Sequence, residues 1–515
     1  MRLTKTKKRF FFYTSTILLT NVLLLTGCAV GPDYKKPDQW TPSKWEKPAA
    51  GKDSQSVVSE TNLRTPSPEW WDCFNDPMLS NLEKQVSNSN LDVLLSTQRL
   101  LESRAQMQIS GADRFPALNA SGGYSRTQYS NKSISRAVHR AINSRNGSSL
   151  GPMINSSDID VPTLNEWMDN IDTSWEVDLW GRVRRQYESA HANWQASEEE
   201  RRGVLITQQA EVAHDYIALR GFQAQLAIVK ENQKIAQESL LLAKQRFTGG
   251  LVTELDIQTA EAQLDQTVAD IPQLEQQIAE QTNALALLLG KPPRALSEEF
   301  ATVKPIPPVP PQIPVGLPSE LARRRPDIRQ AESQLHAATA EVGVAVANFY
   351  PKVTINAQFG FQSLSFRDLG FWSSRAWNVG PTISLPIFQG GRLKGQLALK
   401  KAQQKEAAIF YQKTVLQAWH EVDNALTAYR AEQLRKENIE KTVKANQRAV
   451  YLAQEQYRQG LQNFINVLDA ERRLLTSQKD LVQSTTQIST NLVQLYKALG
   501  GGWETTFPIN PPNKS

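Results

Sequence analysis

Few side chains in this sequence have the types and spacing that enzymes need. The 515-residue chain has five histidines: His139, His191, His214, His336 and His420. None of them lies in an HExxH pattern, which places two imidazoles on one helix face to bind zinc. We identify no nucleophile elbow at a strand-to-helix turn, and the carboxylates are dispersed along predicted helices. We therefore predict no enzyme activity, no metal site and no cofactor.

One cysteine, Cys28, lies in a sequence pattern that predicts its chemical modification. The chain begins with basic residues, continues with an apolar run from Phe10 to Leu25, and then reads Leu25-Thr26-Gly27-Cys28. This order is typical of a secretory signal peptide, and the tetrad resembles the bacterial lipobox. We predict that residues 1–27 are a signal peptide and that Cys28 is the lipidated mature N-terminus. The alternative is an ordinary signal peptide followed by a chance cysteine.

The net charge excludes one class of partner. The formal charge is +6, but five basic residues lie in the predicted signal peptide, which leaves +1 (6 − 5). A nearly neutral chain lacks the basic surface that attracts nucleic acid, so we expect no nucleic-acid partner. Cys73 is the second of two cysteines, and we expect it to be a small buried hydrophobe.

The chain is organised around a helical block that occurs twice. The block runs from Arg182 to Gly290 and returns from Arg392 to Gly500, an offset of 210 residues (392 − 182) without a gap. An internal repeat of this length indicates a duplicated structural unit. Apolar residues recur every seven positions in both copies, at Leu205, Val212, Leu219 and Leu226, and at Val415, Val422 and Tyr429. This period predicts coiled-coil seams, and no apolar run approaches the ~18 residues of a spanning helix.

Each long helix is predicted to end at a glycine turn and to reverse. The turns are residues 247–251 and 457–461, and a second helix follows each of them to about Gly290 and Gly500. Glycine at a helix end supplies the left-handed conformation that stops the helix. Further helices are expected over residues 79–113 and 326–348.

Four segments alternate apolar and polar residues, as β-strands do. They are residues 116–129, 171–179, 353–362 and 377–387. Alternation over about ten residues is the weak signature of transmembrane strands, with one face toward lipid and one toward a polar lumen. An ordinary half-buried hairpin is the alternative for each segment alone. The repeat, the lipobox and the long helices together favour the membrane interpretation.

One chain supplies four strands, and an open sheet edge cannot face lipid. Two copies would give eight strands, which fill their own interior, whereas three would give twelve and leave a lumen. Asp172, Glu176 and Asp178 are expected on the lumen side, where they need water. We therefore favour three copies. The predicted fold is an α+β membrane protein, a trimeric 12-stranded β-barrel continued by a periplasmic coiled-coil α-barrel.

The predicted domains follow from these elements. They are a signal peptide (1–27), a lipidated, proline-rich surface tether (28–78), a first repeat (79–290), a proline-rich connector without helix or strand (291–317), a second repeat (318–502) and a tail (503–515).

The mature chain resembles TolC-type outer-membrane efflux proteins, in the lipoprotein branch that serves resistance-nodulation-division pumps. The most specific matches are residues 317–332 (LPSELARRRPDIRQAE), residues 457–470, and Trp70-Trp71 with Phe74, Asp76 and Leu79. The resemblance implies a homotrimer, anchored to outer-membrane lipid and extending into the periplasm. It also implies an assembly with a periplasmic adaptor protein and an inner-membrane resistance-nodulation-division transporter.

The resemblance also implies a gate at the end of the helices farthest from the barrel. Asp256, Tyr457 and Asp469 match the family's gate residues, and three copies of Asp469 around a threefold axis would attract cations. Gln462 stands where TolC carries an arginine and Asn466 where it carries an aspartate. These two differences put an Asp256–arginine bridge in doubt. The family implies that the adaptor docks at the same tip, which here has Gly249, Gly250, Leu251, Gly460 and Leu461.

Two classes of function remain open. The first is a passive exit duct for a pump that expels drugs or other small toxic compounds, with type I protein secretion as a variant. The second is a periplasmic coiled-coil structural or adaptor lipoprotein, which would lack alternating spanning strands. The lipobox and the arginine-rich 317–332 segment favour the efflux duct.

Overall fold

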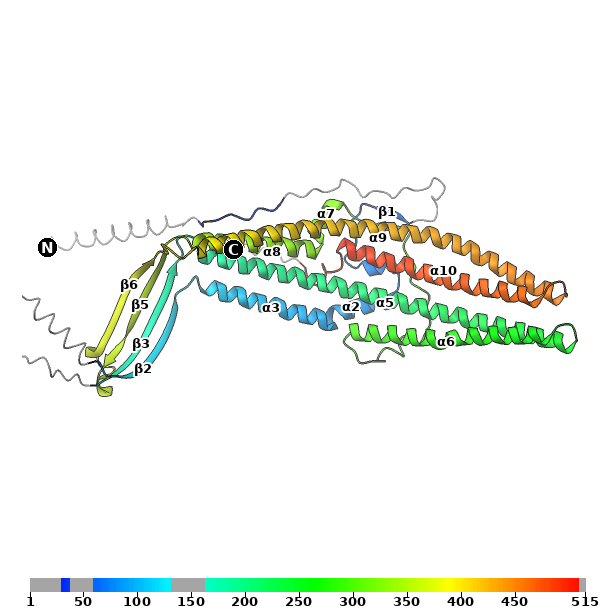
Figure 1. The fold of residues 1–515 in the computed structure, drawn as a ribbon, viewed down its shortest axis with the longest axis horizontal. Coiled ribbons are helices and arrows are strands. Elements are labelled where there is room, and N and C mark those ends of the chain that lie inside the picture. The colour runs from blue at the N-terminus through cyan, green and yellow to red at the C-terminus, as the bar shows by residue number, and fades with distance from the viewer. Residues whose placement is uncertain (1–28, 38–58, 131–162, 509–515) are drawn as a thin grey trace, which may run out of the picture. The chain divides into compact units, whose positions relative to one another are not determined.

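Figure 1 shows the computed structural model, which describes residues 29–37, 59–130 and 163–508. Cys28 and the predicted signal peptide lie outside these residues. Within the described ranges, no helix is both long enough and apolar enough to cross a membrane. The chain forms two compact units. The described parts of the first unit are residues 29–34, 105–130, 163–191 and 337–404, and the remaining described residues form the second.

The first unit contains a four-stranded antiparallel sheet (Figure 1). Its strands are β2 (Ala117–Thr127), β3 (Leu164–Val177), β5 (Lys352–Ser363) and β6 (Arg375–Ser384), in the order β2-β3-β5-β6. All four predicted strands are confirmed, and six of their eight bounds agree within two residues, but two bounds differ by more. β3 begins seven residues before the predicted Ile171, because polar residues on both of its faces hide the alternation there. β6 ends at Ser384, three residues before the predicted Ile387.

The register of the sheet separates an apolar face from a polar face. Residues that stand opposite each other share a face, and so do residues two apart along a strand. Ile171, Phe359 and Trp377 form one row of the apolar face, and Trp175 and Ile355 lie in a second row. The next row on the other face is Asn119, Asp172, Gln358 and Asn378. Asn119 donates to Asp172 (3.3 Å) and Asn356 to Thr382 (3.1 Å), so the polar face carries its own hydrogen bonds.

Glycines allow the chain to turn from strand into helix. Gly181 has a φ of +81°, and a β-carbon there would lie 2.7 Å from the Cα of Ala29. The backbone N–H of Val30 donates to the carbonyl of Trp180 (3.0 Å), so the N-terminal segment lies directly on this junction. Gly390 and Gly391, which precede the second long helix, also have positive φ. The predicted sharp bends are confirmed at both junctions.

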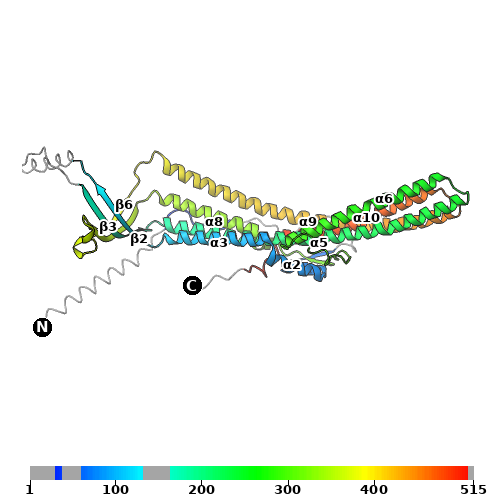
Figure 2. The same cartoon turned by 90° about the horizontal axis from the view of Figure 1, so that it is seen from below.

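The long helices and their partners match the prediction closely. The helices are α5 (Arg182–Thr248), α6 (Glu254–Leu288), α8 (Pro326–Ala347), α9 (Arg392–Arg458) and α10 (Phe464–Leu499). The heptad residues Leu205, Val212, Leu219, Val415, Val422 and Tyr429 are buried, whereas Leu226 is half-buried. In the second unit α6 runs back beside α5 and α10 beside α9, which forms two helical hairpins (Figures 1 and 2). Only the helix predicted at 79–113 is different, because it is two helices.

Those two helices are α2 (Pro77–Ser89) and α3 (Leu91–Ala112), and Asn90 separates them. The Asn90 backbone is extended, and its side chain accepts from the backbone N–H groups of Asp92 (2.9 Å) and Val93 (3.1 Å). These bonds are those of a helix N-cap. An asparagine inside an apolar pattern therefore starts a new helix, which the periodicity alone did not show.

The tether and the connector are more structured than predicted. Strand β1 (Glu60–Asn62) pairs in parallel with β4 (Gln312–Pro314), so the prediction of a connector without strands was wrong. The short helix η1 (Trp70–Phe74) buries Trp70, Trp71 and Phe74, so this part of the predicted surface tether belongs to the core. A helical turn, α7 (Pro318–Arg324), follows the connector. Hydrogen bonds to distant parts of the chain hold the tether in place. Ser59 bonds to Gln433, Tyr429 and Pro310, which all lie more than 200 residues away in sequence.

Candidate gate and docking tip

The two helix reversals in the second unit have the same backbone geometry. At the end of α5, Gly250 donates to Phe247 (2.9 Å) and Leu251 to Arg246 (3.0 Å). At the end of α9, Gly460 donates to Tyr457 (3.0 Å) and Leu461 to Gln456 (2.9 Å). This bond pair, with a left-handed residue at the reversal, is the Schellman motif. Gly250 (φ +69°) and Gly460 (φ +77°) supply that conformation, whereas Gly249 has no positive φ.

A small apolar core holds the two hairpins together near their turns. It contains Ala243, Ala260, Tyr457, Phe464, Val467 and Leu468, all buried. The rings of Tyr457 and Phe464 lie 5.1 Å apart. Because α5 and α6 contribute the alanines and α9 and α10 the larger residues, the cluster joins the first hairpin to the second.

One cation also crosses between the hairpins. The guanidinium carbon of Arg246 lies 4.6 Å from the centroid of the Tyr457 ring, and its Nη1 donates to the backbone carbonyl of Tyr457. Burial raises the pKa of Tyr457, and the negative charge of Asp256 adds to this, while Arg246 opposes it. Arg246 lies in no recognised motif and was not among the predicted gate residues. The 210-residue offset could have indicated it, because the second copy carries Gln456 at the equivalent position.

Polar bonds continue this contact along the helices. From α10, Arg472 donates to Gln263 (2.6 Å) and Lys479 to Asp270 (2.5 Å), both on α6. Ser239 on α5 donates to the buried Glu471 (2.6 Å) on α10. Burial raises the pKa of Glu471, and the bonds from Ser239 and Gln454 oppose the rise. The partners on α6 and α10 are each seven residues apart, so they follow the coiled-coil seam.

The residues expected at the gate are not all brought together. Asp256 lies close enough to Tyr457 to influence it electrostatically. In the described part of the chain, its carboxylate has no ion pair. Asn466 donates to Gln462 on the same helix, and Asp469 pairs with Arg473 (3.0 Å), with both side chains more than half exposed. One chain therefore holds Tyr457 in its core and leaves Asp469 on an open helix surface.

Exposed aliphatic side chains surround the two turns. Leu251 and Leu461, expected in the docking tip, are 68% and 70% exposed. Leu255 and Ile465, one helical turn further on and also related by the repeat, are exposed to a similar degree. This second pair was not predicted, although the 210-residue offset relates its members as it relates those of the first pair. Both turns therefore present matched pairs of exposed apolar residues.

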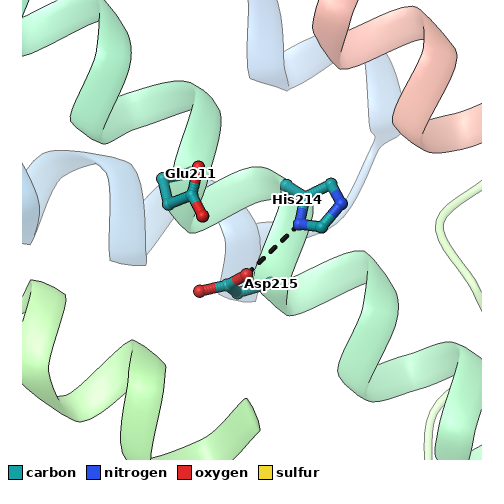
Figure 3. A group of neighbouring side chains, drawn as sticks. All are labelled: Glu211, His214 and Asp215. Carbon is teal, nitrogen blue, oxygen red and sulfur yellow. Dashed lines mark hydrogen bonds and ion pairs between the residues drawn. The ribbon is translucent and has the colours of Figure 1, made fainter.

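A different group of ligand-type side chains lies on α5 (Figure 3). The ligand atoms of Glu211, His214 and Asp215 lie within 4.8 Å of one another, although no metal-ligand spacing was predicted for the histidines. His214 Nδ1 lies 3.2 Å from Asp215 Oδ1 (Figure 3). That hydrogen bond is the main cause that raises the pKa of His214, and nearby Lys497 opposes it. The contact that joins His214 to this group is its hydrogen bond with Asp215, so we describe the two as a histidine–aspartate pair.

Comparison with known proteins identifies the class. The outer membrane efflux protein family matches residues 82–291 and 317–501, which is more than half of the chain. The chain therefore belongs to the outer membrane efflux protein family. Members of this family are outer-membrane channel proteins of efflux systems and not enzymes.

Individual relatives extend over nearly the whole chain. SilC of Salmonella typhimurium, named a probable outer membrane lipoprotein, is 30% identical over 96% of this chain and 99% of its own. TtgC of Pseudomonas putida, named a probable efflux pump outer membrane protein, is 31% identical over 94% of this chain and 95% of its own. Among solved structures, the outer-membrane channel OprN is 32% identical and has a TM-score of 0.81, covering 93% of this chain and 100% of OprN. The crystal structure of CusC has a TM-score of 0.75 at 27% identity, covering 92% of this chain and 100% of CusC.

Proposed function

We propose that three copies of this chain form a lipid-anchored duct through the outer membrane, which carries small toxic compounds out of a tripartite efflux pump. The partners are a periplasmic adaptor protein and an inner-membrane transporter of the resistance-nodulation-division type. TtgC, which matches almost end to end, supports the assignment to an efflux pump, and SilC supports an outer-membrane lipoprotein. The fold of OprN supports a channel.

The observation that carries the proposal is the two-faced sheet. Four strands have one apolar face and one polar face with internal hydrogen bonds. The outer strands β2 and β6 have no further partner in the described sheet, and lipid would not tolerate their unpaired backbone groups. Three copies would close these edges into twelve strands, with Gln358 and Asn378 lining a wet lumen.

The length of β3 fits an outer membrane, with Asp169 near its outer end on the same face as Ile171. From Trp167 to Val177, β3 rises about 33 Å at ~3.3 Å per residue. At a strand tilt of about 40°, this spans about 25 Å, which is long enough to cross the apolar band of such barrels. Aromatic pairs stand near both ends, Tyr124 with Trp167 (4.4 Å) and Trp180 with Tyr350 (4.8 Å). Paired aromatic residues at both boundaries are typical of transmembrane barrels.

The helical tip supports a gate and a docking surface. Tyr457 and Arg246 join the two hairpins of one chain, and three copies of the exposed Asp469 would meet near the threefold axis. Like charges in a narrow ring repel, so the ring attracts cations. Leu251, Leu461 and the neighbouring aliphatic residues would receive the adaptor.

The N-terminal segment supports a lipid anchor at Cys28. Val30 is hydrogen-bonded at the strand-to-helix junction, and Arg185 forms an ion pair with Asp33. These contacts hold the segment that follows Cys28 at the junction between sheet and helix. An acyl chain on Cys28 would therefore emerge next to the membrane surface. Mass spectrometry of the mature N-terminus tests this anchor, and an unmodified Cys28 would exclude it.

The alternatives fit less well. A periplasmic adaptor or structural coiled coil would not need four alternating strands, and the strands are present. A protein-secretion duct shares the fold, but TtgC, which matches over nearly the full length, is named as a probable efflux pump protein.

An arginine scan of β5 and β6 tests the duct. Arginine at Ile355 or Val379, on the apolar face, should cost about 2–4 kcal/mol near the bilayer midplane and block membrane assembly. Asn356→Arg and Thr382→Arg are matched controls on the polar face, and they should assemble. Equal defects on both faces would count against a barrel. The readout is the fraction of folded trimer in outer-membrane extracts.

A further inference from the structure

The loop between β5 and β6 is unusually rich in exposed aromatic side chains. Residues 364–374 include two short 3₁₀ turns, η2 (Phe366–Asp368) and η3 (Trp372–Ser374). Phe366, Phe371 and Trp372 are each more than 60% exposed. Three large apolar rings exposed to water are unfavourable, so their placement indicates that this loop contacts an apolar partner.

Ring contacts place this loop on the apolar face of the sheet. Phe366 lies 4.9 Å from Trp167, and Trp372 lies 6.5 Å from Phe359, measured between ring centroids. Phe359 stands opposite Ile171, and Trp167 is four residues before Ile171 on β3. An even spacing along a strand keeps the same face. The loop therefore folds against the apolar face and does not pack on the polar face.

Charged groups accompany the rings. The guanidinium of Arg375 lies 4.7 Å from the Trp372 ring, and its Nη1 donates to the Trp372 carbonyl (2.6 Å). Arg367 is exposed in η2, next to Asp368. Asp169, in the same sheet row as Arg375, accepts the Phe361 N–H through its Oδ1 (3.1 Å). Aromatic rings with arginines at the edge of an apolar band match the boundary between hydrocarbon and lipid headgroups.

We infer that the β5–β6 loop is a membrane anchor, whose rings insert into the headgroup region of the outer leaflet and whose Arg375 contacts a lipid phosphate. This inference rests on the proposed barrel. The helices leave the sheet at its other end, so the loop end faces outward if the helices are periplasmic. The partner is a phosphorylated glycolipid of the outer leaflet, because a planar guanidinium binds phosphate through paired N–H groups. A lid across the pore would instead pack against Gln358 and the other polar-face residues.

Site-directed labelling tests where the loop lies. Burial raises the pKa of the Cys73 thiol to about 12, so a thiol-reactive fluorophore should label an introduced cysteine selectively. The variants are Phe371→Cys in the loop, Val379→Cys on the apolar face and Asn356→Cys on the polar face. The labelled proteins are reconstituted in vesicles, and lipid-attached and aqueous quenchers are compared, with the unmodified protein as blank.

We expect the lipid-attached quencher to reduce fluorescence at least twofold at positions 371 and 379. At position 356, only the aqueous quencher should reduce fluorescence. If position 379 behaves as predicted and position 371 responds only to the aqueous quencher, the anchor is wrong and the barrel stands. If position 379 is not reached by the lipid quencher, both proposals fail.

The phosphate contact has a separate test. Native mass spectrometry of the detergent-solubilised protein compares bound lipid A with its dephosphorylated form. Arg375→Gln should reduce retention of the phosphorylated lipid at least fivefold and leave the dephosphorylated lipid unchanged. Arg392→Gln is the control, because Arg392 lies outside the sheet and bonds Gln389. Equal retention of phosphorylated lipid by Arg375→Gln and the parent protein would overturn the phosphate contact.

Discussion

Arg246 holds Tyr457 at two points: its guanidinium stacks 4.6 Å from the ring centroid, and its Nη1 donates to the backbone carbonyl. These contacts connect the first helical hairpin to the second. The repeat does not duplicate them, because Gln456 and Phe247 occupy the equivalent positions. The two hairpins of each chain are therefore joined at the tip by one arginine–tyrosine contact, and the repeat provides no second, equivalent contact.

Removal of this contact should loosen the tip. We expect Arg246→Gln and Tyr457→Ala each to weaken the closed state by about 1–3 kcal/mol, the range of a cation–π contact plus a charged hydrogen bond. Since 1.4 kcal/mol is a factor of ten, single-channel recordings should show a clear rise in open time. Arg458→Gln is the control, because Arg458 pairs with Glu455 on its own helix (2.7 Å). Parental conductance in both tip variants would place the gate elsewhere.

Asp469 should set the ion selectivity of the tip. Its carboxylate pairs with Arg473 on the same exposed helix surface. Asp469→Ala should reduce cation preference, whereas Arg473→Gln should increase it, because the carboxylate loses its partner. Reversal potentials in a salt gradient measure both variants. A shift of the same sign in the two would show that Asp469 does not act on the permeating ion.

Glu83 should make stability depend on pH. It is completely buried on α2, and neither carboxyl oxygen has a hydrogen-bond partner among the described residues. Burial raises the pKa of Glu83 well above its ordinary value. Its contribution to folding is thus fully present below the unfolded pKa near 4.5 and is lost as pH rises toward the folded pKa.

Glu83→Gln should therefore become more stable than the parent protein as pH increases from 5 to 8, by about 1.4 kcal/mol per chain for each unit of the pKa shift. Chemical denaturation at several pH values measures this difference. Glu238→Gln, at an exposed position of α5, should follow the parent protein. A pH-independent difference for Glu83→Gln would mean that the carboxyl is not neutral in the fold.

The histidine–aspartate pair on α5 should be visible in a titration. The Asp215 hydrogen bond raises the pKa of His214 above its ordinary 6.5. Asp215→Asn should lower the pKa of His214, and Glu211→Gln should lower it less, because Glu211 acts only through space. Histidine-labelled NMR can follow it, since the chain has five histidines. An unchanged His214 pKa in Asp215→Asn would show that the two side chains do not pair in solution.

The repetitive parts of this fold could be predicted from sequence, because period and turn chemistry are local. The heptads around Val212 and Val422 and the glycines at 250 and 460 predict both helical hairpins. Long-range contacts could not be predicted in this way. Asn90 caps a helix because its side chain accepts the backbone N–H of Asp92, which the apolar pattern does not indicate. β1 pairs with β4 across 250 residues of chain (312 − 62).

In the candidate gate, too, some residues could be predicted from the sequence and others only from the fold. Tyr457 could be selected by resemblance, but Arg246 lies 211 residues away in sequence and meets it only in the folded hairpins. Leu255 and Ile465 carry no motif, and exposure alone distinguishes them from the buried heptad residues. Asp469 was expected beside the threefold axis, and a single chain cannot place it there.

The duct is tested most directly by planar-bilayer recording of the purified, lipidated protein, with the mass of the same sample measured by native mass spectrometry. We predict a trimer, three times the mass of one mature chain plus its lipid, that inserts as one unit. Its conductance should be small while the tips are fastened and should increase in Arg246→Gln. A monomer or dimer, or a trimer that never conducts even in Arg246→Gln, would contradict the duct.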